Sequence, residues 1–312
     1  MNEGVQDEPG GAERAGTVAL VGRPNAGKST LMNRLLGEKL AIVSDKPQTT
    51  RHRMVGILSE DRGQMVFYDT PGVHRPLHRL NRQMVDYALE ALGDTDVRCL
   101  LVDARIPFGR GDAYLLDLVA RTEGTRLLVL NKIDRMPKER LLPLIDRYRK
   151  AADFAEIVPV SALTGEGCDL LLGLLWSYLP EGPPLYDPEL LTVHAVRFLA
   201  AERIREKVLE QTRDELPYTT AVRIDRWEEE GRLTRVFATV LVDKESQKAI
   251  VIGRGGQAIK ALGTAARLGL EELLEGKVYL DLQVTAEPGW RENRQVLATL
   301  DRDVWATRVS SP

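Results

Sequence analysis

Hydrophobic and polar residues alternate along the first 180 residues in a pattern that predicts short strands separated by helices. Six apolar runs are typical of strands: TVALVG, MVGILS, QMVFYDT, RCLLVDA, RLLVLNK and IVPVSA. Several are apolar on both faces, as strands covered by helices on two sides must be. Helix-like segments such as STLMNRLLG separate most of them, whereas the short turn EDRG makes the second and third runs a hairpin. The pattern predicts an α/β domain with a mostly parallel, doubly wound sheet and ligand loops at the carboxyl ends of its strands.

A segment with four prolines, LPEGPPLYDPELLT, ends this pattern. The order then becomes a helix, a two-stranded hairpin, a short apolar segment, a glycine loop, a helix and the strand VYLDLQVTA. This order predicts a smaller α+β domain with helices on one face of a sheet. The expected divisions are a disordered tail (1–16), a first domain (17–180), a linker (181–192), a second domain (193–287) and a C-terminal tail (288–312).

Composition narrows the class of protein only slightly. A chain of 312 residues exceeds the usual size of one core, and a hydrophobic content of 43% with 29% charged residues predicts a folded globular protein. The formal net charge of -3 means that any nucleic-acid surface must be a local patch. No run approaches the roughly 18 apolar residues of a membrane span, and Cys99 and Cys168 lack metal-ligand spacing, so we expect a cytoplasmic protein with buried thiols.

The stretch GRPNAGKST follows the first predicted strand and opens a helix. It fits G-x-x-x-x-G-K-[ST], the loop whose glycines let a phosphate chain approach the backbone N–H groups and the positive end of the helix. Lys28 is expected to reach the β- and γ-phosphates, and the Ser29 hydroxyl to ligate Mg²⁺. The predicted phosphate contacts are Gly22, Asn25, Ala26, Gly27, Lys28, Ser29 and Thr30.

Three further strand ends narrow the ligand. The motif DTPG offers Asp69 to hold Mg²⁺ through water and the Gly72 N–H to sense a γ-phosphate. In NKID, Asp134 can accept from two adjacent N–H groups of guanine, which adenine lacks, while Asn131 supports the base edge and the Lys132 stem covers the purine. The last predicted strand ends in three residues whose backbone N–H groups can approach the guanine carbonyl: Ser161, Ala162 and Leu163.

Together, these four motifs resemble those of the translational-type GTPases, so the implied ligands are GTP or GDP with Mg²⁺. In GTPases the loop that follows the first helix is a switch, in which a threonine closes on Mg²⁺ and the γ-phosphate. The corresponding segment here is AIVSDKPQTTRHRMVG, with Thr50 as the candidate and Thr49 as a close rival. The expected metal ligands are therefore Ser29, Thr50 and Asp69.

The second predicted domain contains a GxxG loop within VIGRGGQAIK. In KH domains such a loop clamps the nucleic-acid backbone beside an apolar groove for bases, and the element order matches the type II KH arrangement. The expected RNA contacts are Lys248, Ile252, Gly253, Arg254, Gly255, Gly256, Ile259 and Lys260. Core packing is the alternative role for the two isoleucines, and a solvated surface is the alternative for the charges.

The motifs GRPNAGKST, PQTTRHR, DTPG, NKID and SAL, followed by a KH domain, closely resemble the Era-like GTPases, a family of bacterial ribosome-assembly factors. The resemblance runs from about Thr17 to about Arg294. It implies a GTP-hydrolysing switch that binds 16S ribosomal RNA near its 3′ end and assists assembly of the 30S subunit. It also implies a cytoplasmic monomer and leaves open a peripheral contact with the inner membrane.

One departure from many GTPases concerns hydrolysis. Val73 occupies the place of a glutamine that orients the attacking water, so turnover without a helper should be slow. In some relatives of this family, the asparagine corresponding to Asn25 holds a K⁺ ion beside the phosphates, and we carry this role over as a hypothesis. The expected catalytic residues are Asn25, Lys28 and Thr50. Alternative functions are an RNA-binding protein with a structural nucleotide, or a tRNA-modification or tandem-domain GTPase.

Overall fold

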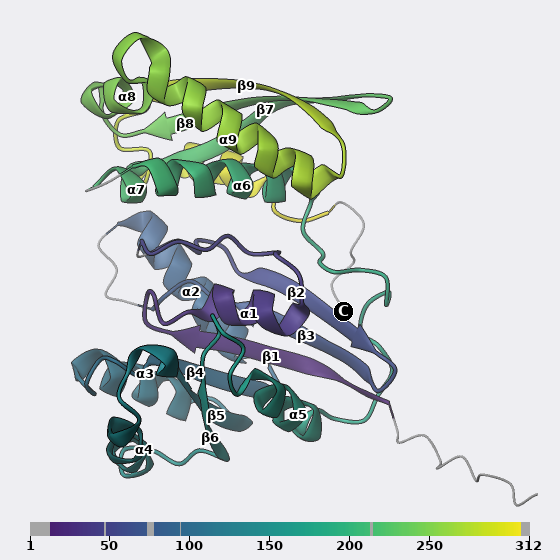
Figure 1. The fold of residues 1–312 in the computed structure, drawn as a ribbon, viewed down its shortest axis with the longest axis vertical. Coiled ribbons are helices and arrows are strands. Elements are labelled where there is room, and N and C mark those ends of the chain that lie inside the picture. Colours follow the sequence, from purple (N-terminus) through teal and green to yellow (C-terminus); the bar gives the residue numbers. More distant parts are fainter. Residues whose placement is uncertain (1–12, 47, 74–77, 94, 213–214, 307–312) are drawn as a thin grey trace, which may run out of the picture.

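The structure is a computed structural model that describes residues 13–46, 48–73, 78–93, 95–212 and 215–306. Two α/β units follow one another along its long axis (Figure 1). The first unit contains β1 (Arg14–Gly22), α1 (Lys28–Leu36), β2 (Met54–Glu60), β3 (Gly63–Asp69), α2 (Arg79–Gly93), β4 (Val97–Asp103), α3 (Arg110–Ala120), β5 (Thr125–Asn131), η1 (Ile133–Arg135), η2 (Lys138–Arg140), α4 (Leu141–Arg149), β6 (Glu156–Val160) and α5 (Cys168–Tyr178).

The six strands of the first unit form one sheet in the order β2-β3-β1-β4-β5-β6, and only the β2–β3 pair is antiparallel. Helices α1 and α5 pack on one face of the sheet, and α2, α3 and α4 pack on the other. The apolar strands are thus buried from both sides, which explains why their sequences are nearly uninterrupted in hydrophobicity. The predicted α/β fold, including the antiparallel edge strand, is confirmed.

The first strand begins earlier than its hydrophobic pattern predicts. Arg14, Ala15 and Gly16 pair with the start of β3, so these three residues belong to the sheet rather than to the tail assigned to residues 1–16. Glycine and arginine give no apolar signal, but the Arg14 guanidinium also donates to the Leu179 carbonyl at 2.6 Å. Residues 1–12 of that tail lie outside the described residues.

The proline-rich linker lies against the antiparallel edge of this sheet. The Gln64 carboxamide oxygen accepts from the Leu185 and Tyr186 N–H groups, both at 2.8 Å, and the Ile57 N–H donates to Leu191 at 2.8 Å. The linker is therefore fixed to the first unit before the chain enters the second.

The second unit contains α6 (Val196–Gln211), α7 (Leu216–Thr219), β7 (Ala221–Glu230), β8 (Leu233–Val242), α8 (Glu245–Ile252), η3 (Arg254–Gly256), α9 (Gln257–Leu274) and β9 (Lys277–Ala286). Its sheet has the order β7-β8-β9, with β7 antiparallel and β9 parallel to β8. Helices α6 and α9 share one core with the inner face of this sheet (Figure 1). The predicted KH arrangement of a small sheet under helices is confirmed.

The segment assigned to a C-terminal tail, 288–312, is structured over much of its length. Trp290 is fully buried and donates to the Thr219 carbonyl at 2.9 Å, and Leu297 of α10 (Arg294–Asp301) packs with Leu80 of α2. This helix is too short and too polar to be recognised by hydrophobic periodicity alone. Residues 307–312 lie outside the described residues. Among the helices that the structure describes, none has the length and apolar character needed to cross a membrane.

Candidate functional site

The glycine loop between β1 and α1 forms one wall of a cleft at the carboxyl ends of the strands. Asn25 and Gly27 adopt positive φ angles of 61° and 95°. A Cβ on Gly27 would lie 2.2 Å from the Asn131 amide nitrogen, and one on Gly22 would lie 2.4 Å from the Leu101 carbonyl oxygen. The loop therefore requires glycine at both motif positions. Residues that line the cleft include Asn25, Gly27, Lys28, Ser29, Thr30, Thr50 and Gly72.

Three oxygen-bearing side chains meet at the inner end of this cleft. The Ser29 hydroxyl donates to Asp69 Oδ2 at 2.5 Å and lies 2.9 Å from Thr50 Oγ1, which is itself 3.3 Å from Asp69 Oδ2. The Thr49 hydroxyl instead donates to the Lys46 carbonyl at 2.6 Å. The structure therefore places Thr50, and not its rival Thr49, at the predicted metal site.

This oxygen cluster has the chemistry that Mg²⁺ requires. The Asp69 side chain is fully buried, yet its Oδ1 has no hydrogen-bond partner among the described residues. Mg²⁺ prefers oxygen ligands and is commonly bound by one or two protein groups together with water and phosphate. The described residues contain no cluster of three or more His, Cys, Asp or Glu side chains, so the hydroxyls would have to contribute to binding a metal.

Lys28 lies beside the cluster as a buried cation. Its side chain is buried, and burial lowers the pKa of the ammonium group while the Asp69 charge opposes that shift. Burial raises the pKa of Asp69, against the influence of Lys28 and of hydrogen bonds from Ser29 and Thr50. A polyphosphate beside Lys28 and a divalent cation beside Asp69 would each favour the charged form of its neighbour. The two groups are therefore suited to binding a metal-bound phosphate.

The switch loop, defined here as residues 37–53 between α1 and β2, closes over the glycine loop. Asn25 Nδ2 donates to the Asp45 carbonyl at 2.7 Å, which joins the two loops directly. Val73 is buried in the sheet core and its N–H donates to Gly22 at 3.2 Å, so it presents no polar side chain to the cleft. Gly72 lies against Pro24 of the glycine loop, where a Cβ would approach the Pro24 backbone to 2.7 Å.

The strand ends of β5 and β6 form the base-side part of the site. Asn131 Nδ2 donates to the Ala26 carbonyl at 2.8 Å, and its Oδ1 accepts from the Ala162 N–H at 3.0 Å. The Ser161 hydroxyl donates to Asp134 Oδ1 at 2.7 Å. Asn131 thus ties the glycine loop to the SAL segment, while Ser161 orients the carboxylate predicted to recognise guanine.

Lys132 crosses the entrance of this base-side region. Its ammonium donates to the Asn25 carbonyl at 2.5 Å and to Asp103 Oδ2 at 2.9 Å. Although burial alone would raise the pKa of Asp103, hydrogen bonds from Arg105 and Lys132 lower it to about 2. The lysine stem is therefore fixed at both sides of the site.

Two supporting residues were missed by sequence reasoning. Asp103 ends the strand RCLLVDA, and its position beside the NKID strand was the available signal. Arg34 of α1 donates to the carbonyls of Ala162 at 3.3 Å and Leu163 at 2.7 Å, which fixes the SAL segment although the Leu163 side chain is exposed. Arg34 follows the phosphate motif by one helical turn, and no sequence pattern links it to a segment so far along the chain.

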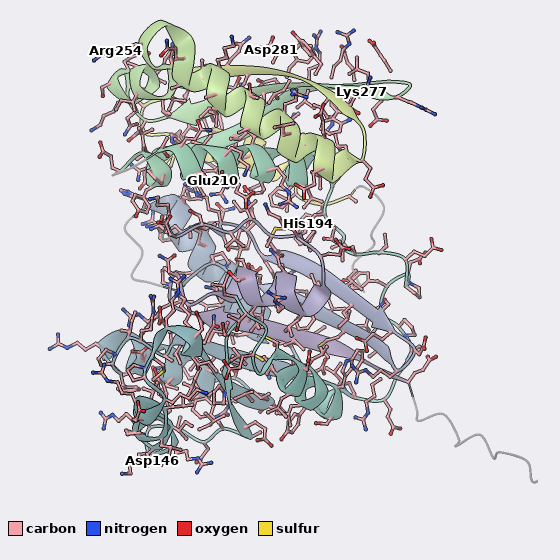
Figure 2. All side chains as sticks on the ribbon, viewed as in Figure 1. Asp146, His194, Glu210, Arg254, Lys277 and Asp281 are labelled. Carbon is pink, nitrogen blue, oxygen red and sulfur yellow. The ribbon has the colours of Figure 1, made fainter. Side chains whose placement is uncertain are left out.

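A second candidate site lies at the GxxG loop between α8 and α9. Gly253, Gly255 and Gly256 have φ angles of 72°, 56° and 76°, so the loop exposes a backbone path that other residues adopt only at a cost. Arg254 is exposed at the end of the second unit farthest from the first (Figure 2). Lys260 is exposed and Lys248 is partly exposed on the flanking helices, so cations surround the glycine loop.

The two isoleucines predicted to line a base groove have a mixed environment. Ile252 and Ile259 are partly buried and pack against the core of the second unit. Ile250 in α8 is 60% exposed. Core packing therefore accounts for part of the two predicted positions, and Ile250 is the more accessible apolar group.

Profiles of two protein families match the sequence. The 50S ribosome-binding GTPase profile matches residues 17–132, and the KH domain profile matches residues 215–291. GTPase Era of Syntrophus aciditrophicus is 46% identical over 286 residues, which are 91% of this chain and 94% of the relative. GTPase Era of Geobacter metallireducens is 45% identical over 289 residues, which are 92% of this chain and 97% of the relative.

Solved structures agree with these sequence matches. A variant of Aquifex aeolicus Era bound to GDP·AlF₄⁻ has a TM-score of 0.89 and 38% identity, over 92% of this chain and 98% of that one. Era in complex with MgGDPNP and nucleotides 1506–1542 of 16S ribosomal RNA has a TM-score of 0.90 and 37% identity, with the same shares covered.

Proposed function

The chain belongs to the Era family of GTPases, and on that basis we propose that it is a GTP-controlled factor for assembly of the small ribosomal subunit. In this proposal the GTPase unit alternates between GTP and GDP, and the KH unit binds 16S ribosomal RNA near its 3′ end. A solved relative bound to MgGDPNP and to nucleotides 1506–1542 of 16S ribosomal RNA supports both ligands. An assembly factor of the 30S subunit acts where ribosomes are made, which places the protein in the cytoplasm.

The cluster of Ser29, Thr50 and Asp69 is the observation that carries the nucleotide part of the proposal. Because Thr50 belongs to the switch loop and Ser29 to the glycine loop, a metal held here joins the two loops. Bound Mg²⁺ would neutralise charge on the β- and γ-phosphates. A structural nucleotide would require no such switch threonine, so this cluster favours a switch over a constitutive RNA-binding protein.

The residues of this chain divide the remaining work. Lys28 and the N–H groups at the start of α1 bind the phosphates, and the Gly72 N–H senses the γ-phosphate. Asp134 accepts from the guanine N–H groups, with its orientation set by the Ser161 hydroxyl at 2.7 Å. Asn131 holds the two parts of the site in register, and Lys132 covers the base.

A monovalent cation is a further part of the proposal. Val73 supplies no group to orient water, so charge stabilisation near the transferred phosphate must come from elsewhere. The Asn25 amide lies against the switch-loop backbone at Asp45, which supports a K⁺ ion held by Asn25 and that backbone. Turnover compared in K⁺ and Na⁺ salts tests this point: faster turnover in K⁺ is expected, and equal rates contradict it.

GTP turnover measured with and without an RNA of 16S nucleotides 1506–1542 tests the function as a whole. RNA bound to the KH unit is expected to change the turnover number, because the two sites belong to one switch. A mutated RNA of equal length is the control. Equal turnover with either RNA, or without RNA, would favour an RNA-binding protein whose nucleotide is structural.

A further inference from the structure

One face of helix α6 carries charged side chains that are buried against the first unit. Figure 1 shows α6 on the side of the second unit that faces the GTPase unit. Arg203, Arg205 and Glu206 are 6%, 2% and 2% exposed. Glu202 accepts from Arg205 through both of its oxygens, at 2.7 and 2.6 Å. Burying an ion costs on the order of several kcal/mol unless its partners compensate, so the partners of this face indicate its role.

Several of those partners are atoms of the switch loop. Glu206 Oε1 accepts from the Val43 N–H at 3.0 Å, and Oε2 accepts from the Lys39 ammonium at 2.8 Å. Arg203 Nη2 donates to the Lys39 carbonyl. Backbone atoms carry most of these contacts, so the face of α6 recognises the path of the switch loop more than its side chains.

The contacts are closest to the predicted chemistry at Thr50, which is held from both sides by the second unit. On one side, Arg205 Nη2 donates to the Thr49 carbonyl, one peptide bond before Thr50. On the other side, Arg51 Nη1 donates to the Thr220 carbonyl at 2.6 Å. Thr50 is therefore fixed by two arginine contacts while its hydroxyl lies 2.9 Å from that of Ser29.

The opposite face of α6 connects this contact to the RNA side of the KH unit. Apolar residues of α6 and of α9 pack in one core: Ala200, Ile204, Val208, Leu262, Ala266 and Leu270. Helix α9 begins at Gln257, immediately after the GxxG loop. Since a packed core transmits strain between rigid helices, α6 joins the RNA loop to the switch loop.

We propose that Arg205 is a positioning residue for GTP hydrolysis: from the KH unit it fixes the Thr49 carbonyl and thereby holds the Thr50 hydroxyl at the metal site. The KH unit thus completes the GTPase site. When the switch loop opens, the buried guanidinium loses its acceptor, so loop opening and separation of α6 from the GTPase unit form one event. This inference rests on the proposed role of Thr50.

The test compares Arg205→Met with Lys207→Met in the full chain. Lys207 forms a salt bridge with Glu210 at the same spacing on the same helix, with a closest Nζ–oxygen distance of 2.8 Å, which makes it a matched control. We expect Arg205→Met to lower kcat about 10- to 100-fold, the usual effect of misplacing a catalytic group. The Mg²⁺ concentration for half-maximal turnover should rise, while the affinity for fluorescent GDP should stay as in the wild type.

A double variant guards against a simple loss of folding. Arg205→Met alone leaves Glu202 as an unpaired buried charge, whereas Glu202→Gln combined with Arg205→Met removes both charges. The double variant is expected to show the same fall in kcat and the same weaker Mg²⁺ dependence. A lower melting temperature with unchanged kcat and unchanged Mg²⁺ dependence would mean a structural role only and would overturn the inference.

Thr50→Ala separates this inference from the function on which it rests. If Thr50→Ala loses turnover while both Arg205 variants retain it, the proposed function stands and the positioning role fails. If Thr50→Ala retains wild-type turnover and Mg²⁺ dependence, the proposed metal role of Thr50 fails, and the role of Arg205 fails with it.

Discussion

The nucleotide site and the GxxG loop are both built around glycines, but they are held in different ways. At the nucleotide site, buried side chains from four strand ends fix one another, as Asn131 does through its contacts with Ala26 and Ala162. At the GxxG loop, the conformation belongs to the backbone itself, and a Cβ on Gly255 would meet nothing within 4 Å.

This difference separates two ways of binding a phosphate. A site that must hold one nucleotide and close around it needs buried charges, because charges act strongly where water is excluded. A loop that grips a passing nucleic-acid backbone needs accessible N–H groups and mobile surface cations. Substitutions should therefore have large effects on chemistry at the first site and smaller, more graded effects on affinity at the second.

The largest effect is expected at Lys28. Replacement by alanine removes a buried cation that faces the phosphates, and loss of one such preorganised group costs about 100- to 1000-fold in turnover. Phosphate release at saturating GTP measures the change, with Lys150→Ala at the exposed end of α4 as control. Turnover close to that of the wild type would show that the buried cation is not part of the chemistry.

Asp134→Asn should change the choice of base rather than the chemistry. A hydrogen bond to a charged group contributes about 1.5 to 3 kcal/mol, so GTP affinity should fall by about 10- to 150-fold. Xanthosine triphosphate has a carbonyl in place of the guanine amino group and should gain affinity, because the asparagine amide can donate to it. Competition binding measures both changes, with exposed Asp146→Asn as control. An unchanged preference for guanine would place base recognition elsewhere.

Alanine at two glycines of the GxxG loop should separate steric from conformational cost. Both positions have positive φ, which costs an alanine about 1 to 2 kcal/mol. At Gly253 the new Cβ would also lie 2.6 Å from the Ala258 Cβ, and overpacking adds about 1 to 3 kcal/mol. Chemical denaturation should therefore show a larger loss of unfolding free energy for Gly253→Ala than for Gly255→Ala. Equal losses would mean that the loop relaxes freely.

The smallest effect is expected for a single surface cation. Lys260→Ala should weaken RNA binding and lower the slope of log affinity against log salt by about 0.7, the value for one phosphate contact of a single strand. Lys277 is equally exposed but lies at the start of β9, so Lys277→Ala is the matched control. Equal slopes for both variants would remove Lys260 from the RNA surface.

Sequence reasoning predicted the fold and the nucleotide residues well because each motif lies at the end of an apolar strand. Parallel strands place their carboxyl ends at one edge, so the motifs had to meet there. The choice between Thr49 and Thr50 depended on which hydroxyl reaches Asp69, a contact across 19 residues that no local pattern encodes. Asp103 was missed for the same reason, since its partner Lys132 lies on the neighbouring strand.

The contact between the two units was beyond the reach of sequence patterns. The segment ERIREK in α6 has the composition of a solvated helix face, yet Arg205 and Glu206 are among the most buried charges of the chain. Their burial follows from docking against the switch loop, which only the tertiary structure contains. The helix that includes Leu297 was missed in a similar way, because its short apolar face gains its meaning from Leu80 in the first unit.

The affinity for an RNA of 16S nucleotides 1506–1542, measured once with GDP and once with a non-hydrolysable GTP analogue, tests the central claim most directly. If nucleotide state and RNA binding form one switch, the two affinities must differ by at least about tenfold, which corresponds to a coupling free energy of about 1.4 kcal/mol. We predict tighter binding with the GTP analogue. Equal affinities in the two nucleotide states would contradict the account.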